Sequence, residues 1–354
     1  AFNAGLSAAE LAAFNAATPN RFAFKHAHSG QNAEKDWGKT TLQAVEFAFW
    51  AINERYGEVQ GGEHVKTFTP KNTITIASSI SNGGGAAIAA AEQDADGWIS
   101  GVAVSEPAIE MPANPGVRVE RGGAAVATTA KPLIDFTTVA NLYQACAALA
   151  PSIASTPYAA GFAVGFASAA LPIAPNRCAS LAARGLLSAS TTPTQAEEAL
   201  QKLRDYGWEG ESNALHASLA AFEVAPAVAV TFANSLSSAS VRDNLCGFSY
   251  AATTAAGAVT PLAPAALAGM FATGNGVPPT SGVQLVNNLG KFGPARDFLS
   301  ASPAGAFDWN LDGAVCLRNL VTGTDAAARK LQAGLDETRR SGNLRGKPTL
   351  IVHG

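Results

Sequence analysis

The sequence has few charged residues and no long uninterrupted apolar run. Of its 354 residues 14% are charged, the net charge is -3, and no stretch is rich in Lys and Arg, so the composition does not favour nucleic-acid binding. Pro, Gly, Ser and Thr interrupt the Ala-rich segments before about 18 consecutive apolar residues accumulate, so no membrane span is expected. With 47% hydrophobic residues, we expect a globular chain that buries a substantial core.

Cysteine is also scarce. The four cysteines are far apart and form no C-x-x-C, which argues against a zinc site or a redox dithiol. They allow two disulfides, but buried free thiols are equally compatible with this spacing. We expect neither a metal nor a cofactor. The cysteines are Cys146, Cys178, Cys246 and Cys316.

The first residues lack an initiator methionine and a basic-then-apolar signal pattern. They read AFNAGLSAAELAAFN. Any targeting segment is therefore expected to have been removed or never included.

The most informative stretch runs from Asn72 to Gly85 and reads NTITIASSISNGGG. Residues 73–77 have the β-branched pattern of a buried strand, and the glycine run that follows leads into a helix-forming segment. A serine at such a strand-to-helix turn is a nucleophile elbow, usually G-x-S-x-G, with Ser79 here in place of the first glycine. This makes Ser81 the candidate nucleophile.

Two other interpretations compete for the same stretch. A dinucleotide-binding loop needs three small residues, and Ile88 stands where the third belongs after Gly83 and Gly85. Alternatively, the glycines only allow the helix and the strand to pack closely. The pattern alone leaves this second alternative open.

Regular elements flank the elbow. The spacing of apolar residues predicts a helix over 36–56, with Gly57 as a left-handed cap, packed on a sheet. A helix over 83–93 and a strand over 98–105 follow. Helices alternating with strands predict a parallel sheet and an α/β class.

From residue 107 onward the sequence is rich in Ala, Pro, Ser and Gly, up to Gly346. We interpret 108–346 as a large, mostly helical cap inserted between a core of residues 1–107 and a returning buried strand over 347–354. The cap would emerge at the sheet edge that carries Ser81 and shape an apolar pocket. Its expected elements are helices over 139–149, 192–207 and 325–340, a break at Pro226, and a loop over 274–293.

Histidine is the usual base in such sites. Residues 21–28 read as a short extended piece that would place His26 and His28 on one side. A direct chemical role for either is one hypothesis, and a structural role is the more frequent one.

Long stretches of the sequence resemble one family. KHAHSGQNAEKDWGKTTLQAVEFAF, TITIASSISNGGGAAIAAAEQDADGWISGVAVSEP, FDWNLDGAVCLRNL and GKPTLIVHG are similar to the D-(-)-3-hydroxybutyrate oligomer hydrolases. The resemblance implies a serine esterase of α/β-hydrolase type, distantly similar to tannases and feruloyl esterases. It implies cleavage of small 3-hydroxybutyrate oligomers to monomers, downstream of polyhydroxybutyrate depolymerase in lipid and butanoate metabolism.

The resemblance also assigns roles to residues. Ser81 corresponds to the nucleophile, and the triad Asp and His are expected beyond Gly354, so the chain resembles an internal fragment that is nearly inactive alone. The backbone N–H of Asn82, placed after the nucleophile, can donate to the oxyanion. Glu106 is either an acid in an unusual arrangement or a solvated residue, and His353 is expected to be structural.

Two alternative functions and the cellular compartment of the protein remain open. In tannases a cysteine typically lies beside the nucleophile, where this sequence has Ile80. A non-catalytic module on a hydrolase scaffold is the other alternative. The resemblance implies a secreted or periplasmic protein, although no signal peptide is present in these residues and a cytoplasmic location is the alternative.

Overall fold

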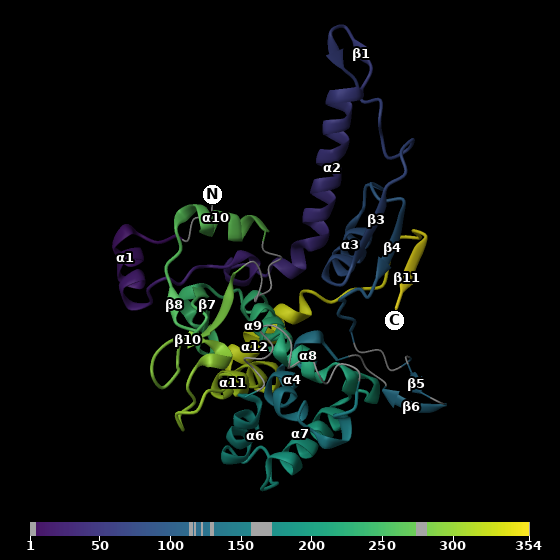
Figure 1. Ribbon diagram of the computed structural model, residues 1–354. Coiled ribbons are helices and arrows are strands. Elements are labelled where there is room, and N and C mark those ends of the chain that lie inside the picture. Colours follow the sequence, from purple (N-terminus) through teal and green to yellow (C-terminus); the bar gives the residue numbers. More distant parts are fainter. Residues whose placement is uncertain are drawn as a thin grey trace. The chain divides into compact units, whose positions relative to one another are not determined.

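The chain forms two compact units (Figure 1). The computed structural model describes residues 5–112, 116, 118–121, 123–127, 131–156, 172–273 and 282–353. Ala33–Leu133 and Leu335–Gly354 make up one unit, here called the elbow unit, and Ala1–Asn32 with Ile134–Gly334 make up the other, the helical unit. These limits differ from the boundaries predicted at 107/108 and 346/347. The first 32 residues belong to the helical unit, and residues 108–133 and 335–346 belong to the elbow unit.

Three parallel strands form the sheet of the elbow unit, as predicted from the alternation of helices and strands. The strands are β3 (Ile76–Ile80), β4 (Gly101–Ser105) and β11 (Thr349–Val352), in the order β11-β4-β3. Ile80 pairs with Ser105, and Ser105 pairs with Val352. The three strands therefore end at the same level.

Two helices of the elbow unit lie against each other. These are α2 (Trp37–Tyr56), close to its predicted limits, and α3 (Asn82–Gln93). Their backbones approach closely at Gly38, where an added Cβ would lie 2.6 Å from the carbonyl carbon of Ala89. α2 therefore packs on α3, whereas the sequence predicted packing on the sheet. Gly57 is extended, with φ -64°, and not left-handed as predicted.

The remaining elements of the elbow unit are short. They are η2 (Ala33–Asp36), β1 (Val59–Gln60), β2 (Glu63–His64), β5 (Val119–Arg121) and β6 (Ala124–Ala127). β1 pairs antiparallel with β2, and β5 pairs antiparallel with β6.

Only one face of the parallel sheet is covered within the elbow unit. Apolar residues of α3, among them Ile88, pack on Val102 and Val104 of β4. In contrast, β3 and β11 were predicted to be buried and are exposed: Ile80 is 63% exposed and Leu350 is 60% exposed. The sequence pattern identified apolar strands, but their burial requires a second layer, which the described residues do not supply.

The helical unit is built mainly from helices. Its α-helices are α1 (Ala8–Ala17), α4 (Leu133–Ala147), α6 (Ala174–Ala183), α7 (Thr192–Tyr206), α8 (His216–Ala221), α9 (Val224–Leu236), α10 (Pro264–Thr273), α11 (Leu311–Thr322) and α12 (Ala326–Asp336). Its 3-10 helices are η1 (Lys25–His28), η3 (Pro151–Ile153), η5 (Gly210–Ala214), η6 (Val241–Asp243), η7 (Leu245–Gly247) and η8 (Asp297–Leu299). Throughout the described ranges, no helix combines the length and the hydropathy that a membrane span requires.

Local signals predicted several of these helices. α7 begins after its N-cap residue Thr191 and ends at Gly207. The φ of Gly207 is 117°, a left-handed conformation that only glycine adopts without strain. Pro226 lies in the first turn of α9, where its missing N–H costs no hydrogen bond, and α8 ends before it. The predicted division of the apolar run at this proline is thus confirmed.

A four-stranded antiparallel sheet in the helical unit was not predicted. It consists of β7 (Phe248–Thr253), β8 (Val259–Thr260), β9 (Gln284–Asn287) and β10 (Ala295–Arg296), in the order β10-β9-β7-β8. The loop predicted over 274–293 therefore contains a strand, although residues 274–281 lie outside the described part of the chain. Likewise, residues 25–28 form the 3-10 helix η1 and not an extended piece. The strand β9 is formed by pairing with β7 and β10, which a local pattern does not specify.

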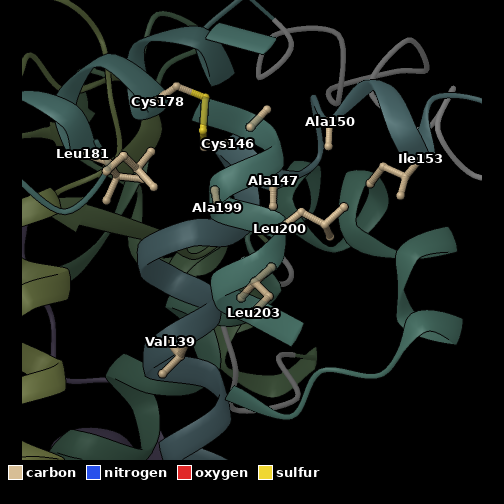
Figure 2. Close-up of a cluster of buried hydrophobic side chains, with 12 residues drawn as sticks. Val139, Cys146, Ala147, Ala150, Ile153, Cys178, Leu181, Ala199, Leu200 and Leu203 are labelled. Atoms are coloured by element: carbon tan, nitrogen blue, oxygen red, sulfur yellow. A yellow bond between two sulfur atoms is a disulfide. The ribbon is translucent and has the colours of Figure 1, made fainter. Parts of the chain in front are cut away.

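One hydrophobic core of the helical unit lies between α4, α6 and α7 (Figure 2). Leu181, Leu200 and Leu203 are fully buried in it, together with a disulfide between Cys146 and Cys178. A second disulfide joins Cys246 and Cys316. All four cysteines are thus paired, so the alternative of buried free thiols is wrong.

We expect replacement of both Cys146 and Cys178 by alanine to lower the free energy of unfolding by about 3 to 4 kcal/mol. The disulfide closes a loop with a sequence separation of 32, and its loss restores conformational entropy to the unfolded chain. Urea unfolding without reductant measures the difference. An unchanged midpoint would contradict the expected contribution of this disulfide.

Four buried charged side chains lie together with the partly buried Arg296 in the helical unit. Arg177 pairs with Asp308, with 3.1 Å between Nε and Oδ1, and Arg296 pairs with Glu223. Asp297 lies near both pairs and accepts a hydrogen bond from the backbone N–H of Asn310 at 2.9 Å. Burial raises the pKa of the Asp297 carboxyl from 3.8 to about 7.

The raised pKa of Asp297 predicts that the contribution of this residue to stability depends on pH. Between pH 3.8 and about 7 the folded state holds a proton on Asp297 that the unfolded chain has released, so this residue's contribution to stability falls as pH rises through that window. Asp297→Asn keeps an acceptor for Asn310 but has no proton to lose. We therefore expect the variant to gain stability relative to the wild type from pH 5 to pH 8, as measured by urea unfolding; parallel pH profiles would contradict this.

Candidate active site

Ser81 occupies a strained turn between β3 and α3. Its φ of 57° and ψ of -125° are rare for a residue other than glycine. Its N–H donates to Ser105 O at 3.0 Å, and its carbonyl accepts from Gly85 N at 3.1 Å and Ala108 N at 3.0 Å. These three hydrogen bonds hold the strained residue in place, as expected of a functional turn.

The glycines after Ser81 are required by close packing. An added Cβ at Gly83 would lie 2.1 Å from Ser79 Oγ. At Gly85 it would lie 2.1 Å from the carbonyl oxygen of Ala108. The glycine run thus allows α3 to begin directly at the turn, so the packing alternative from the sequence and the elbow pattern describe the same geometry.

The Ser81 side chain is exposed and does not cap α3. Asn82 is the first residue of α3, and the first N–H groups of a helix have no acceptor within the helix. They carry partial positive charge, which favours an anion at this end. An exposed hydroxyl beside such a donor is suited to nucleophilic attack on a carbonyl group.

Glu106 and His353 lie at the ends of the neighbouring strands. Glu106 adopts φ 45°, and its N–H donates to Val352 O at 2.9 Å. Its carboxylate Oε2 is 2.8 Å from His353 Nδ1. Ser81, Glu106 and His353 each follow directly on residues that pair in register, and neighbouring strands lie about 4.8 Å apart. The sheet therefore brings these three positions together along one edge.

Sequence reasoning proposed Glu106 but did not pair it with His353. The signal that could have found the pair is positional, because both residues immediately follow predicted parallel strands. A parallel sheet aligns the carboxyl ends of its strands, so such residues are candidates for contact.

His28 belongs to the other unit. It is buried beside Tyr250, with 4.9 Å between the ring centroids, and burial lowers the pKa of its imidazole to about 4. A base with this pKa accepts a proton weakly near neutral pH. The side chain of His26 and the whole of Gly354 lie outside the described residues.

Metal-ligating groups are not gathered at this edge. Where the structure describes the chain, no three His, Cys, Asp or Glu side chains are placed to hold a metal ion. The chemistry available at the edge is that of a hydroxyl, helix N–H groups, a carboxylate and an imidazole.

The sequence matches known proteins over its whole length. Residues 1–354 match the family model described as 3HB-oligomer hydrolase. The chain is 69% identical to a D-(-)-3-hydroxybutyrate oligomer hydrolase of Paracidovorax citrulli, 56% identical to one of Ralstonia pickettii and 54% identical to one of Cupriavidus necator. Each alignment covers 100% of this chain and 50%, 48% and 49% of the respective relative.

The chain thus spans about half the length of the curated relatives it matches. No solved structure matches it. The family model nevertheless covers every residue, including the elbow and the strands on either side of it. The chain belongs to the 3HB-oligomer hydrolase family.

Proposed function

We propose that the complete protein containing this chain hydrolyses ester bonds of 3-hydroxybutyrate oligomers, with Ser81 as the nucleophile on an α/β-hydrolase-type core. The observation that carries the proposal is the strained backbone of Ser81, held at a strand-to-helix turn with its side chain exposed. Relatives that are named for hydrolysis of these oligomers support the choice of substrate.

The mechanism uses a covalent intermediate. Ser81 Oγ attacks the ester carbonyl, the alcohol leaves, and water then releases the acyl group from the serine. The N–H of Asn82 donates to the oxyanion, an interaction whose loss typically costs about 3 kcal/mol. In the family pattern the triad acid follows the strand that corresponds to β11 and the histidine comes later, so we assign both roles to residues outside this chain.

Within this arrangement we assign Glu106 a positioning role. Its N–H donates to the backbone carbonyl of Val352, and its carboxylate lies beside the imidazole of His353, both at the end of β11. Since β11 leads toward the expected position of the acid, the Glu106–His353 pair would fix the direction in which the chain leaves the sheet. Activity of residues 1–354 alone would instead favour these two residues as an acid and base.

The two disulfides support a secreted or periplasmic protein, because disulfides persist in oxidising compartments and are rare in the cytosol. A role after polyhydroxybutyrate depolymerase follows from the same substrate assignment. The disulfides also weigh against a tannase-like esterase, since each joins two residues of the helical unit and neither includes a residue beside Ser81.

The decisive experiment compares substrates. The complete protein is incubated with 3-hydroxybutyrate dimer and trimer, and separately with methyl gallate and methyl ferulate, and products are separated by chromatography. Release of 3-hydroxybutyrate alone supports the proposal. Preference for the aromatic esters would favour the tannase-like alternative, and no turnover of any ester would favour a non-catalytic module.

We expect Glu106→Gln in the complete protein to lower kcat roughly tenfold while KM for the dimer stays unchanged. Glutamine keeps the shape but loses the charge beside His353, and small displacements of positioning groups reduce the rate more than the binding. Asp96→Asn, an exposed change before β4, is the matched control. An equal loss of thermal stability and rate would indicate a merely structural role.

A further inference from the structure

The helical unit contains a pocket of about 690 Å³ that no role assigned so far explains. It lies between the end of α1 and the residues after it, η6, and the strands β7 and β8. Its volume is within the range of small-molecule sites. Arg21 and Arg242 line it, and none of its described lining residues is an aspartate or a glutamate. The formal charge of this lining is therefore positive.

Arg21 is a buried cation with neutral partners. Only 8% of it is exposed, yet it forms no ion pair with any carboxylate of the described residues. Its guanidinium donates from Nε to Ser249 Oγ at 2.8 Å, from Nη1 to Pro19 O at 2.8 Å and from Nη2 to Asn288 Oδ1 at 2.9 Å. Buried charges are normally paired, because burial without a counter-charge is costly. Arg21 thus offers a place for an anion.

Two N–H groups of Arg21 are left for a ligand. A guanidinium carries five N–H groups. The Nε–H group is shared between Ser249 Oγ and Asn288 Oδ1, and one N–H of each Nη atom is engaged. One N–H therefore remains on Nη1 and one on Nη2. Paired N–H groups of an arginine are the donors that bind both oxygens of a carboxylate.

The side-chain oxygens beside Arg21 already accept hydrogen bonds from the protein. Ser249 Oγ donates to Asn288 Oδ1 at 2.9 Å, and Asn288 Nδ2 donates to Asn244 Oδ1 at 2.7 Å. What this part of the lining leaves for a ligand is N–H groups, from Arg21, from Arg242 and from the exposed amide of Asn244. Such donors favour an oxyanion over a ligand that itself donates.

Arg242 is the exposed cation of the same pocket. Its side chain is 48% exposed, and its Nη2 is 4.0 Å from Glu10 Oε1. The other oxygen of this carboxylate, Oε2, accepts from the N–H and from the Oγ of Ser7, each at 2.9 Å. An exposed pair at such a distance contributes little, so Arg242 is available to an anion that enters the pocket.

Much of the remaining wall is apolar. An inorganic anion would leave this wall in contact with water, whereas an aliphatic group attached to the anion would cover it. The wall therefore favours a ligand with an apolar body as well as a charged end. Its apolar residues include Phe14, Ala17, Pro19, Val241, Val259 and Pro294.

We propose that this pocket binds a small aliphatic monocarboxylate, with the carboxylate on Arg21 and Arg242 and the aliphatic body against the apolar wall. The carboxylate supplies the counter-charge that Arg21 does not find among its protein partners. The site uses none of the residues assigned to ester hydrolysis, so the inference goes beyond the proposed function and does not depend on it.

Calorimetry on the complete protein tests the choice of ligand, with hexanoate as the probe. Hexanamide has the same body without the charge, and inorganic phosphate has charge without the body, so each should bind about tenfold more weakly than hexanoate. Hexanamide binding as tightly as hexanoate would overturn the anion site. Phosphate binding as tightly as hexanoate would overturn the assignment of an aliphatic ligand.

Variants of the complete protein test the place of binding. Ala17→Phe fills the pocket from an exposed position at the end of α1 and should weaken hexanoate binding about tenfold. Ala12→Phe, exposed on the same helix and absent from the lining, is the matched control and should leave the Kd unchanged. Arg242→Gln should weaken hexanoate binding several-fold. An unchanged Kd in Ala17→Phe or in Arg242→Gln, or no binding of hexanoate to the wild type, would overturn the inference.

Discussion

Replacing Ser81 with alanine in the complete protein is expected to reduce kcat for 3-hydroxybutyrate dimer by roughly 10⁴-fold or more. Residues of a nucleophile, base and acid act as a unit, so loss of the nucleophile removes the covalent route even where binding remains. The backbone should be unaffected, because alanine at φ 57° is strained to the same extent as serine and the three backbone hydrogen bonds remain. Release of 3-hydroxybutyrate, measured by chromatography, gives the rate.

Ser78→Ala is the matched control for this change. Ser78 is an exposed serine of β3, three residues before Ser81, and the proposal assigns it no chemistry. It should retain wild-type activity and labelling by a fluorophosphonate, whereas the Ser81 variant should lose both. Retained turnover after Ser81→Ala would show that another residue is the nucleophile.

Gly85→Ala is expected to disrupt the elbow and to lower the free energy of unfolding by about 3 kcal/mol. The added Cβ would lie 2.1 Å from the carbonyl oxygen of Ala108, a backbone atom that cannot rotate away. Ala108 N also donates to Ser81 O, so displacing Ala108 displaces the serine. The rate of dimer hydrolysis should therefore fall by a larger factor than the fraction of folded protein. Both can be measured on one preparation, by dimer hydrolysis and by urea unfolding.

Gly269→Ala provides the control for helix propensity. Gly269 is also helical, in α10, and an added Cβ there would have nothing within 4 Å. Alanine should stabilise that helix by about 1 kcal/mol, since glycine is a poor helix former. If Gly85→Ala were equally neutral, the close approach to Ala108 could not be what holds the elbow.

Short-range patterns were enough to predict the parts of the molecule that depend on neighbouring residues. The serine and glycines from Ser79 to Gly85 specified a strand-to-helix turn, because only small residues permit that approach. The helix α2 followed from apolar residues three and four positions apart, and the end of α7 followed from Gly207. Each of these signals acts over a few residues of the chain.

Tertiary structure alone decided what depends on residues far apart in sequence. Glu106 and His353 meet because β4 and β11 are paired in register, and no local pattern specifies that pairing. The same holds for the partners of the four cysteines and for the sheet that includes β9. Whether an apolar strand such as β11 is buried is likewise decided by which elements cover it. Local periodicity records which face of a strand is apolar, but packing between distant segments decides what that face contacts.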